Sequence, residues 1–173
     1  MKRGANISNY LKPLCDAPCQ AYLTADLQVA DVLEWILEQV GTASIYQTSF
    51  SISEEFLRRL YFIHRQGLMD SLSLVLDMKA TNKTVKLWPF ISQVADKAYL
   101  ADNHSKILLV VARSGERVAV VTSQNLTRGN RYESAIVTSL PAVCEALLQQ
   151  LNDLITYHAV PLNDLFSGNA STN

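Results

Sequence analysis

The sequence predicts an α/β domain with a mixed, mainly parallel β-sheet flanked by helices, and three observations support this prediction. Residues 43–50 and 72–78 are rich in the aromatic, β-branched and aliphatic residues that strands favour. A helical pattern separates them, and a strand–helix–strand unit of this kind joins parallel strands through a crossover. Residues 107–111 are continuously apolar, which is typical of a strand buried on both faces.

The elements around the first strand follow from apolar spacing and capping residues. Residues 1–22 lack periodicity and are expected to form an irregular N-terminal arm. Residues 24–40 carry apolar side chains at helical spacing, and Gly41 stands where a helix C-terminal glycine belongs. Ser51 and Glu54 have capping-box spacing, so the second helix is expected to begin there and to end before the next glycine.

The segment after the second strand is expected to contain a loop, a short helix and a strand. Lys79, Lys83 and Lys86 either contact a substrate or form a solvated surface, and the second interpretation is slightly favoured. Pro89 can begin a short helix but disfavours the interior of a longer one. Residues 97–101 are then predicted to form a short strand.

The second half of the chain is expected to contain a hairpin, a further strand and a long helix. Turn residues at 113–116 separate the buried run described above from a second apolar run at 117–122. Residues 134–139 form the next predicted strand. The helix that follows is predicted to begin at Pro141 and to end near Tyr157.

Length and composition indicate one globular domain of residues 23–158, followed by a tail of residues 159–173 that ends in small, polar residues. The chain has 173 residues, of which 49% are hydrophobic and 18% charged, as in compact proteins. Its net charge of −1 gives no global attraction to nucleic acid or acidic membranes, so such affinity would need a local basic patch. No apolar run reaches the roughly 18 residues of a spanning helix, and no signal-peptide pattern is present. A cytoplasmic location is therefore expected.

The three cysteines do not indicate a metal site. Cys15 and Cys19 lack zinc-finger spacing, and Cys144 lies on an apolar helical face. We therefore expect neither a metal nor a cofactor.

Five polar residues collect near predicted strand ends in the second half of the chain. His104 and Lys106 are two residues apart, so in a strand their side chains would project from the same face. Ser123 and Asn125 follow the second apolar run, and Glu133 precedes the next strand. Open α/β sheets keep their sites at strand ends, and these functional groups together suit chemistry on an anion.

This arrangement resembles the phospholipase D superfamily, and more closely its short, single-motif members, the bacterial endonuclease-like phosphodiesterases. The resemblance runs from about Asp26 to Tyr157 and rests on the signature HxKxxxxD, then GSxN, then a later acidic residue. His104-Ser105-Lys106 matches HxK, Thr122-Ser123-Gln124-Asn125 stands in for GSxN, and Glu133 matches the acidic residue. Each motif alone is weak, but both in this order after a strand–helix–strand unit form a stronger signal.

Two positions depart from the family signature. Val111 stands where the signature has Asp, and Thr122 where it has Gly; the hairpin between the two motif halves is also longer than usual. The resemblance implies that the signature Asp is largely structural. Val111 is therefore expected to lie in an apolar layer, pointing away from His104.

The resemblance also implies a mechanism. His104 would attack phosphorus and give a phosphohistidine, which water then cleaves without the help of a metal. Glu133 would orient the imidazole and stabilise its charged form. Lys106 and Asn125 would hold the non-bridging phosphoryl oxygens, and Ser123 could hydrogen-bond the same group.

The small size and single motif favour a nuclease-like phosphodiesterase, with nucleic acid preferred over phospholipid as the substrate. Arg128 and Arg131, close to Asn125, could contact a backbone phosphate, although arginines beside a turn are more often solvated. The alternative is a catalytically inactive phospholipase D-like module that binds nucleic acid or another polyanion, or that organises a protein partner.

One chain would supply only half of such an active site. A histidine that attacks phosphorus needs a second group to protonate the leaving oxygen, and the resemblance assigns this role to the histidine of a second motif. Neither His64 nor His158 is followed by a lysine two residues later. We therefore expect a homodimer with the site at the two-fold interface, where the two His104 side chains face each other.

Overall fold

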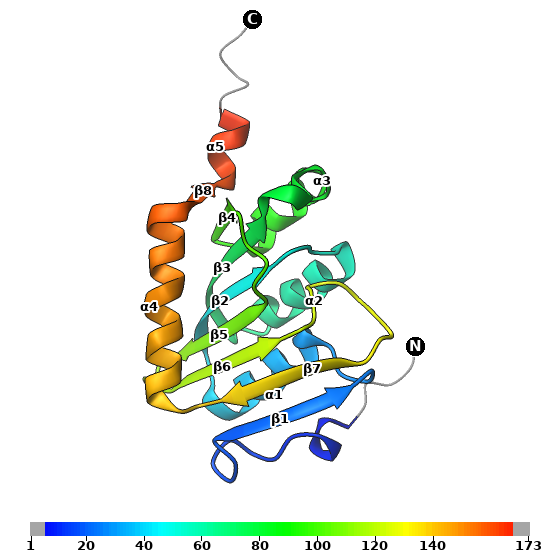
Figure 1. Ribbon diagram of the computed structural model, residues 1–173, viewed down its shortest axis with the longest axis vertical. Coiled ribbons are helices and arrows are strands. Elements are labelled where there is room, and N and C mark those ends of the chain that lie inside the picture. Colours follow the sequence, from blue (N-terminus) through cyan, green and yellow to red (C-terminus); the bar gives the residue numbers. More distant parts are fainter. Residues whose placement is uncertain (1–5, 168–173) are drawn as a thin grey trace, which may run out of the picture.

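The computed structural model, which describes residues 6–167, is built around one eight-stranded mixed β-sheet (Figure 1). Its elements are η1 (Ile7–Asn9), β1 (Cys19–Thr24), α1 (Val29–Val40), β2 (Ala43–Ser49), α2 (Glu54–Arg65), β3 (Met69–Asp77), η2 (Met78–Ala80), α3 (Thr81–Val94), β4 (Lys97–Ala101), β5 (Ile107–Ala112), β6 (Arg117–Thr122), β7 (Glu133–Thr138), α4 (Pro141–His158), β8 (Ala159–Pro161) and α5 (Leu162–Ser167). The strand order across the sheet is β1-β7-β6-β5-β2-β3-β4-β8.

The predicted mixed sheet flanked by helices is confirmed, but parallel pairing is less extensive than expected. It joins β2 to β3 and β3 to β4, which confirms the predicted strand–helix–strand unit. The other neighbouring strands of the described residues pair antiparallel. The expectation of a mainly parallel sheet is therefore wrong. The physical reason is that β5, β6 and β7 follow one another without a crossover helix, and such directly connected neighbours pair antiparallel.

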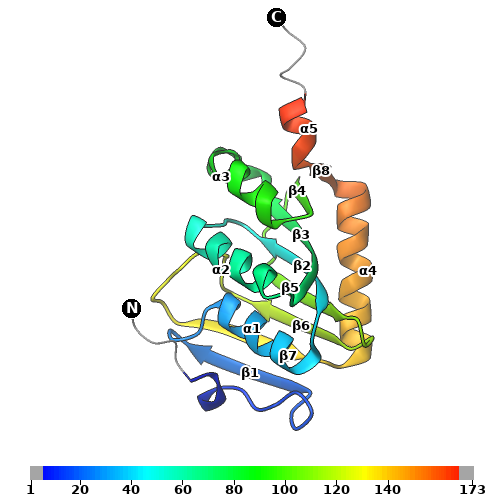
Figure 2. The ribbon, with the colours of Figure 1, turned by 180° about the vertical axis from the view of Figure 1, so that it is seen from behind.

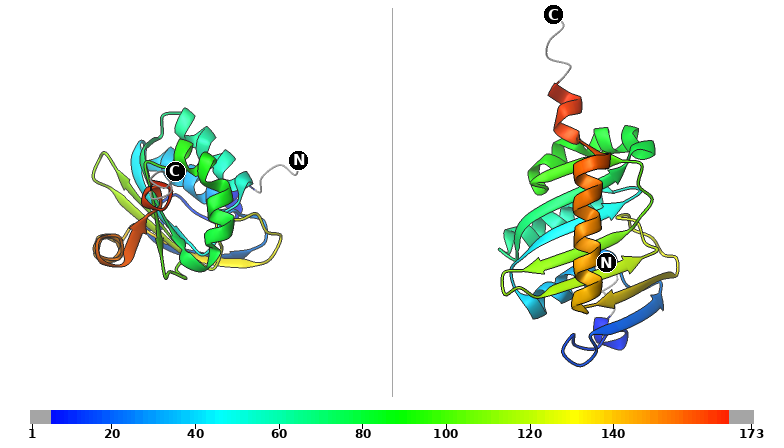
Figure 3. Two further views of the ribbon diagram at one scale, coloured as in Figure 1. Left: turned by 90° about the horizontal axis from the view of Figure 1, so that it is seen from above. Right: turned by 60° about the vertical axis from the view of Figure 1, so that its left-hand side comes forward.

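The sheet separates two helical layers. Helices α1, α2 and α3 cover one face, and α4 crosses the strands on the other (Figures 2 and 3). Leu108 and Val110 of β5 belong to the large core cluster shared with α1 and α2, whereas Leu109 between them packs under α4. The contact with α4 is smaller: Cys144 and Leu151 are the buried residues of this helix. Val143, near the start of the helix, is 40% exposed.

The N-terminal region is more ordered than predicted. Residues 19–24 form strand β1, so the expectation of irregular structure is wrong for residues 19–22, and α1 begins at Val29 instead of residue 24. Because β1 is an edge strand of six residues, its alternation of buried and exposed side chains is too short to stand out in the sequence. Gly41 does end α1, with a positive φ of 77° that favours glycine.

Two helix boundaries also differ from the predictions. Ser53 caps α2, with its hydroxyl accepting a hydrogen bond from Phe56 N at 3.3 Å, so the predicted capping role of Ser51 is wrong. Pro89 lies inside α3, which is therefore longer than the short helix predicted. The carbonyl that Pro89 leaves without its usual donor belongs to Val85, an exposed residue.

The predicted C-terminal tail partly joins the fold. Strand β8 pairs antiparallel with β4, and Leu162 of α5 is buried. The expected small, polar end of the chain lies, for residues 168–173, outside the described residues. Among the helices of residues 6–167, none combines the length and apolar character needed to cross a bilayer.

Candidate functional site

The candidate site lies at the sheet edge where β2, β3, β4 and β6 end and β5 and β7 begin (Figure 1). Because β3 and β2 stand between β4 and β5, the chain must cross the ends of both strands to reach β5. The crossing segment, residues 102–106, carries His104 and Lys106. These two residues therefore lie in a loop and not in a strand, so the same-face argument from strand geometry is wrong.

The loop nevertheless brings His104 and Lys106 together. Lys106 Nζ donates to the backbone carbonyl of His104 at 3.0 Å and lies 3.5 Å from the ring nitrogen Nδ1. The imidazole ring packs beside Phe50, with ring centroids 5.3 Å apart at an angle of 55°. His104 is exposed, whereas Lys106 is partly buried. The imidazole of His104 and the ammonium of Lys106 thus lie side by side at the surface of the protein.

Each strand that the loop crosses provides an anchor for it. At the end of β3, the buried carboxylate of Asp77 accepts from the backbone N–H groups of Lys79 at 2.6 Å and Asn103 at 3.0 Å. At the end of β2, Thr48 Oγ1 accepts from Ile107 N at 3.0 Å. Backbone donors bound to a buried carboxylate form strong hydrogen bonds, so the loop is fixed just before His104 and just after Lys106.

Side-chain contacts complete the loop between these anchors. Asn103 Oδ1 accepts from Ser105 N at 3.1 Å and from Ser105 Oγ at 2.5 Å. Since the Ser105 hydroxyl proton is used there, the 2.8 Å contact between Ser105 Oγ and Thr48 Oγ1 makes Thr48 the donor. Ser105, the middle residue of the HxK motif, therefore faces the sheet.

The second motif half is held by the next residue of β2. Ser49 Oγ lies 3.3 Å from Asn125 Oδ1 and accepts from Leu126 N at 3.0 Å. Gln124, the variable residue of SxN, is buried; its Oε1 accepts from Val29 N at 2.8 Å at the start of α1. These contacts fix the backbone on both sides of Asn125.

Glu133 pairs with Ser123 rather than with the imidazole of its own chain. Ser123 Oγ donates to Glu133 Oε2, and no hydrogen bond joins Glu133 to His104 within residues 6–167. Tyr22 of β1 lies in the same region. Burial raises the pKa of Tyr22 to about 12, and the negative charges of Asp31 and Glu133 add to the shift.

The two predicted arginine contacts are placed differently. Arg128 Nη1 donates to Glu55 Oε1 at 2.6 Å, so this guanidinium is already paired, while Arg131 is exposed. No group of three or more His, Cys, Asp or Glu side chains in the described part of the chain could hold a metal ion. Cys15 and Cys19 are exposed free thiols.

Val111 lies in the layer where it was predicted. It is partly buried and packs against the apolar cluster of Leu109, Cys144 and Leu151 between the sheet and α4. Its partner in β6 is Arg117, at the end of the hairpin remote from Lys106. The prediction of an apolar environment away from His104 is confirmed.

Four residues that hold the site were not identified from the sequence: Thr48, Ser49, Asp77 and Asn103. A signal was present, because each is a polar residue at or just after the end of an apolar strand, and all four are buried. Interpreting that signal requires the strand order, which decides which strand ends the loop crosses.

The sheet order and the loop that carries HxK across two strand ends define a protein with the phospholipase D fold. Solved structures agree. A phospholipase D family member, Nuc from Salmonella typhimurium, superposes with a TM-score of 0.62 at 15% identity, covering 81% of this chain and 95% of the other. NucT from Helicobacter pylori gives a TM-score of 0.59 at 12% identity, with coverage of 81% and 96%. The fold implied by the resemblance is therefore confirmed.

The fold also occurs outside these two proteins. TrmBL2, an archaeal chromatin protein whose structure shows a novel mode of DNA binding, gives a TM-score of 0.56 at 11% identity, covering 83% of this chain and 54% of the other. No protein-family model matches the chain, and no curated protein matches it significantly. At these identities the similarity defines the fold alone.

Proposed function

We propose that this protein hydrolyses phosphodiesters, with His104 as the nucleophile and nucleic acid as the substrate. The observation that carries the proposal is that two successive residues of β2 hold both motif halves. Thr48 Oγ1 lies 2.8 Å from Ser105 Oγ, inside the HxK loop, and Ser49 Oγ accepts from the N–H of Leu126, the residue after Asn125, at 3.0 Å. Segments about twenty residues apart in sequence are thereby gathered at one strand end, as a shared site requires.

In the proposed reaction a ring nitrogen of His104 attacks phosphorus, forming a P–N bond while the P–O bond to the leaving group breaks. Water then attacks the phosphohistidine, the P–N bond breaks, and the imidazole is restored. Lys106 and Asn125 provide donors for the non-bridging oxygens, and the Ser123 hydroxyl, which donates to Glu133 in the free chain, would turn to donate to the same group. Fixed donors of this kind stabilise the charge that develops on the phosphoryl group.

A second copy of the chain completes the site in this proposal. The leaving oxygen needs a proton, and the other histidines, His64 and His158, lie on α2 and α4. In a two-fold dimer, the His104 of the second copy gives that proton and later takes one from the attacking water. Glu133, bound to Ser123 in its own chain, would orient the imidazole of the second copy.

An apolar patch on the sheet face beside α4 is the proposed dimer interface. Leu23 of β1, Val121 of β6 and Ile136 of β7 are 67%, 44% and 52% exposed. Val121 and Ile136 are cross-strand partners, and Ile136 also pairs with Ala21, two residues before Leu23. Contiguous exposed apolar side chains mark interaction surfaces. We expect Ile136→Glu to give a monomer in light scattering and to lower hydrolysis; a wild-type monomer at micromolar concentration would contradict the dimer.

The experiment that tests the function is hydrolysis of bis-p-nitrophenyl phosphate and plasmid DNA in EDTA. We expect His104→Ala to lose activity by several orders of magnitude, whereas His64→Ala, an exposed histidine on α2, retains it. Glu133→Gln should lower the rate less than His104→Ala, because the nucleophile remains. With bis-p-nitrophenyl phosphate, mass spectrometry after an alkaline quench should detect a p-nitrophenylphosphoryl group on wild type only. Equal rates for wild type and His104→Ala, or complete loss in EDTA, would show that the assignment is wrong.

A second candidate function is a non-catalytic module that binds nucleic acid. The DNA-binding chromatin protein with the same fold favours it, as does Val111 at the signature Asp position. Oligonucleotide binding by the wild type without any turnover of either substrate would select this function.

A further inference from the structure

We propose that the lysines of η2 and α3 form a binding surface for the phosphate backbone of a nucleic-acid strand that extends from the site. Lys79, Lys83 and Lys86, here called the α3 lysine stripe, would each contact a phosphate beyond the one at His104. This inference rests on the proposed substrate class and deepens it, since it names where the rest of the strand lies.

The stripe is continuous, exposed and free of acidic residues. Lys83 and Lys86 are three residues apart on α3, a spacing that places side chains on one helical face, and Lys79 lies in η2 just before the helix. All three are exposed, whereas Thr84 and Ile91 turn the other face of α3 toward the protein. After Asp77 the next acidic residue in the sequence is Asp96, so the helix carries no negative charge of its own.

The lysines of the stripe differ from most of the arginines in their pairing. Most arginines of the described residues are in ion pairs: Arg58 with Glu54, Arg59 with Asp31 and Glu34, Arg113 with Asp70, Arg117 with Glu145, and Arg128 with Glu55. Lys83 and Lys86 form no ion pair within residues 6–167. Lys79 Nζ lies 3.4 Å from Asp102 Oδ1, but both side chains are exposed, so this pair is weak and can open.

The stripe begins at the site. The two oxygens of the Asp77 carboxylate bind Lys79 N and Asn103 N, so the first lysine of the stripe and the loop of His104 are fixed to the same group. From Lys79 to Lys86 the chain advances by roughly 10 Å, at about 1.5 Å per helical residue. A single phosphate cannot contact both ends of such a surface, whereas successive phosphates of one strand can.

Charge explains why a local surface of this kind is needed. A chain of net charge −1 has no global field that would concentrate a polyanion. Release of counterions from each neutralised phosphate then makes the affinity depend on salt in proportion to the number of contacts. The slope of that dependence therefore counts the lysines involved.

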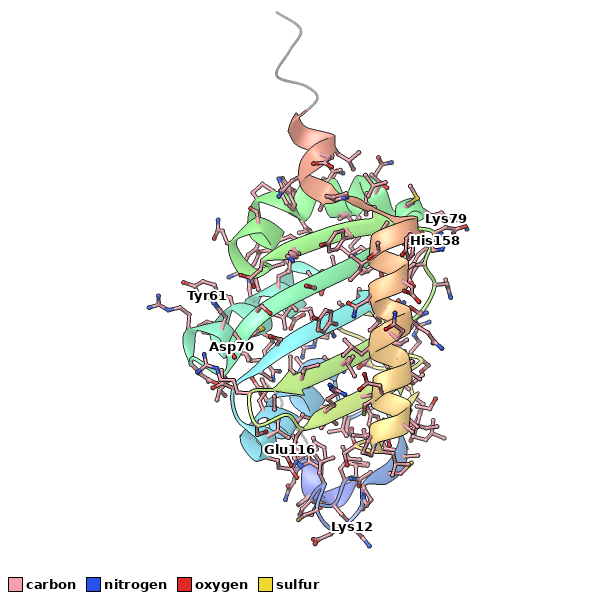
Figure 4. The ribbon with its side chains drawn as sticks, turned by 90° about the vertical axis from the view of Figure 1, so that its left-hand side faces the viewer. Lys12, Tyr61, Asp70, Lys79, Glu116 and His158 are labelled. Carbon is pink, nitrogen blue, oxygen red and sulfur yellow. The ribbon has the colours of Figure 1, made fainter. Side chains whose placement is uncertain are left out.

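The test measures binding of a fluorescent single-stranded 12-mer to the full-length His104→Ala protein by anisotropy, over a range of salt concentrations. Adding Lys83→Gln and Lys86→Gln should reduce the slope of log affinity against log salt by about 1.4, at roughly 0.7 per lost contact on a single strand. The matched control, Lys12→Gln with Lys97→Gln, removes the same charge elsewhere and should leave the slope unchanged. Figure 4 shows Lys12 at the end of the molecule opposite Lys79.

The Asp102→Asn substitution is expected to change the affinity in the opposite direction. It frees Lys79 and removes a negative charge beside the strand, so the affinity should rise. Equal slopes for the stripe variant and the control, or no binding by the parent protein, would overturn the proposal. Hydrolysis by the wild type is measured separately. If the stripe contributes to binding but no hydrolysis occurs, the proposed catalytic function is wrong and the proposed binding surface stands. If hydrolysis occurs but the stripe variant and the control have equal slopes, the binding surface is wrong and the catalytic function stands.

Discussion

Substitution of Asp77 is the most direct test of how the loop that carries His104 is held in place. Asp77 is 1% exposed, and its two carboxylate oxygens accept from Lys79 N and Asn103 N. A hydrogen bond to a charged group contributes about 1.5–3 kcal/mol, so Asp77→Ala should lower the free energy of unfolding by about 3–6 kcal/mol. That is a large share of the roughly 5–15 kcal/mol that stabilises an ordinary domain. Asp77→Asn keeps one acceptor and should cost about half as much.

Urea denaturation followed by tryptophan fluorescence measures the stability of both variants. A second readout separates a positioning role from a general loss of stability. In Asp77→Asn, which should remain folded, the NMR signals of the His104 imidazole should shift and broaden because its loop loses one anchor. The signals of His64, on α2, should stay in place and act as an internal reference.

Asp102→Asn is the matched control for this prediction. Asp102 is in the same loop, but its ion pair with Lys79 is exposed, so its loss should cost less than about 1 kcal/mol. If Asp77→Asn costs no more than Asp102→Asn, or leaves the His104 signals unchanged, then Asp77 does not hold the loop and the account of the site fails.

Three further predictions concern stability away from the motif. Burial raises the pKa of Tyr22 from 10.0 to about 12, so the stability that its neutral phenol provides is complete below pH 10 and is lost as the pH rises to about 12. Urea denaturation should show an alkaline decrease in the free energy of unfolding of roughly 3 kcal/mol that Tyr22→Phe abolishes. Val111→Asp, which restores the signature residue, should destabilise by roughly 1–3 kcal/mol in urea because it places a carboxylate in the layer under α4, and should not raise hydrolysis. Ser53→Ala should cost about 1 kcal/mol as the loss of an N-cap, whereas Ser51→Ala should change the urea midpoint little.

The sequence predicted best those elements whose signal is local. The strands at 107–112 and 117–122 were found nearly to the residue, because each is a continuous apolar run and turn residues separate them. Strand β1 was not predicted because it is an edge strand of only six residues, and its alternation of buried and exposed side chains is too short to stand out in the sequence. Ser51 was chosen as a cap because a glutamate follows at the right spacing. A tertiary bridge between Ile52 and Leu126 instead keeps the chain extended to Ser53.

The residues of the site likewise fall into those that a local pattern predicted and those that it did not. The signature identified His104, Lys106, Ser123 and Asn125 as a group, and the loops do place the first pair in contact. What it could not provide is the identity of the residues that hold them, because these depend on strand order. The loop meets Asp77 only because β3 lies between β4 and β5 in the sheet, and no local pattern specifies that order.

Because the residues that hold the loop lie outside the signature, a chain that lacks the signature Asp can keep the geometry of its site. The signature position, Val111, pairs with Arg117 at the remote end of the hairpin and packs under α4. Its contribution is therefore to sheet–helix packing, where an aliphatic side chain serves as well as any. The carboxylate that fixes the His104 loop belongs to a different strand, at Asp77, which the signature does not include. Losing the Asp of the motif thus removes no hydrogen bond from the loop, whereas losing Asp77 removes one of the two anchors that hold it. A search that scores the motif alone ranks these two positions in the wrong order.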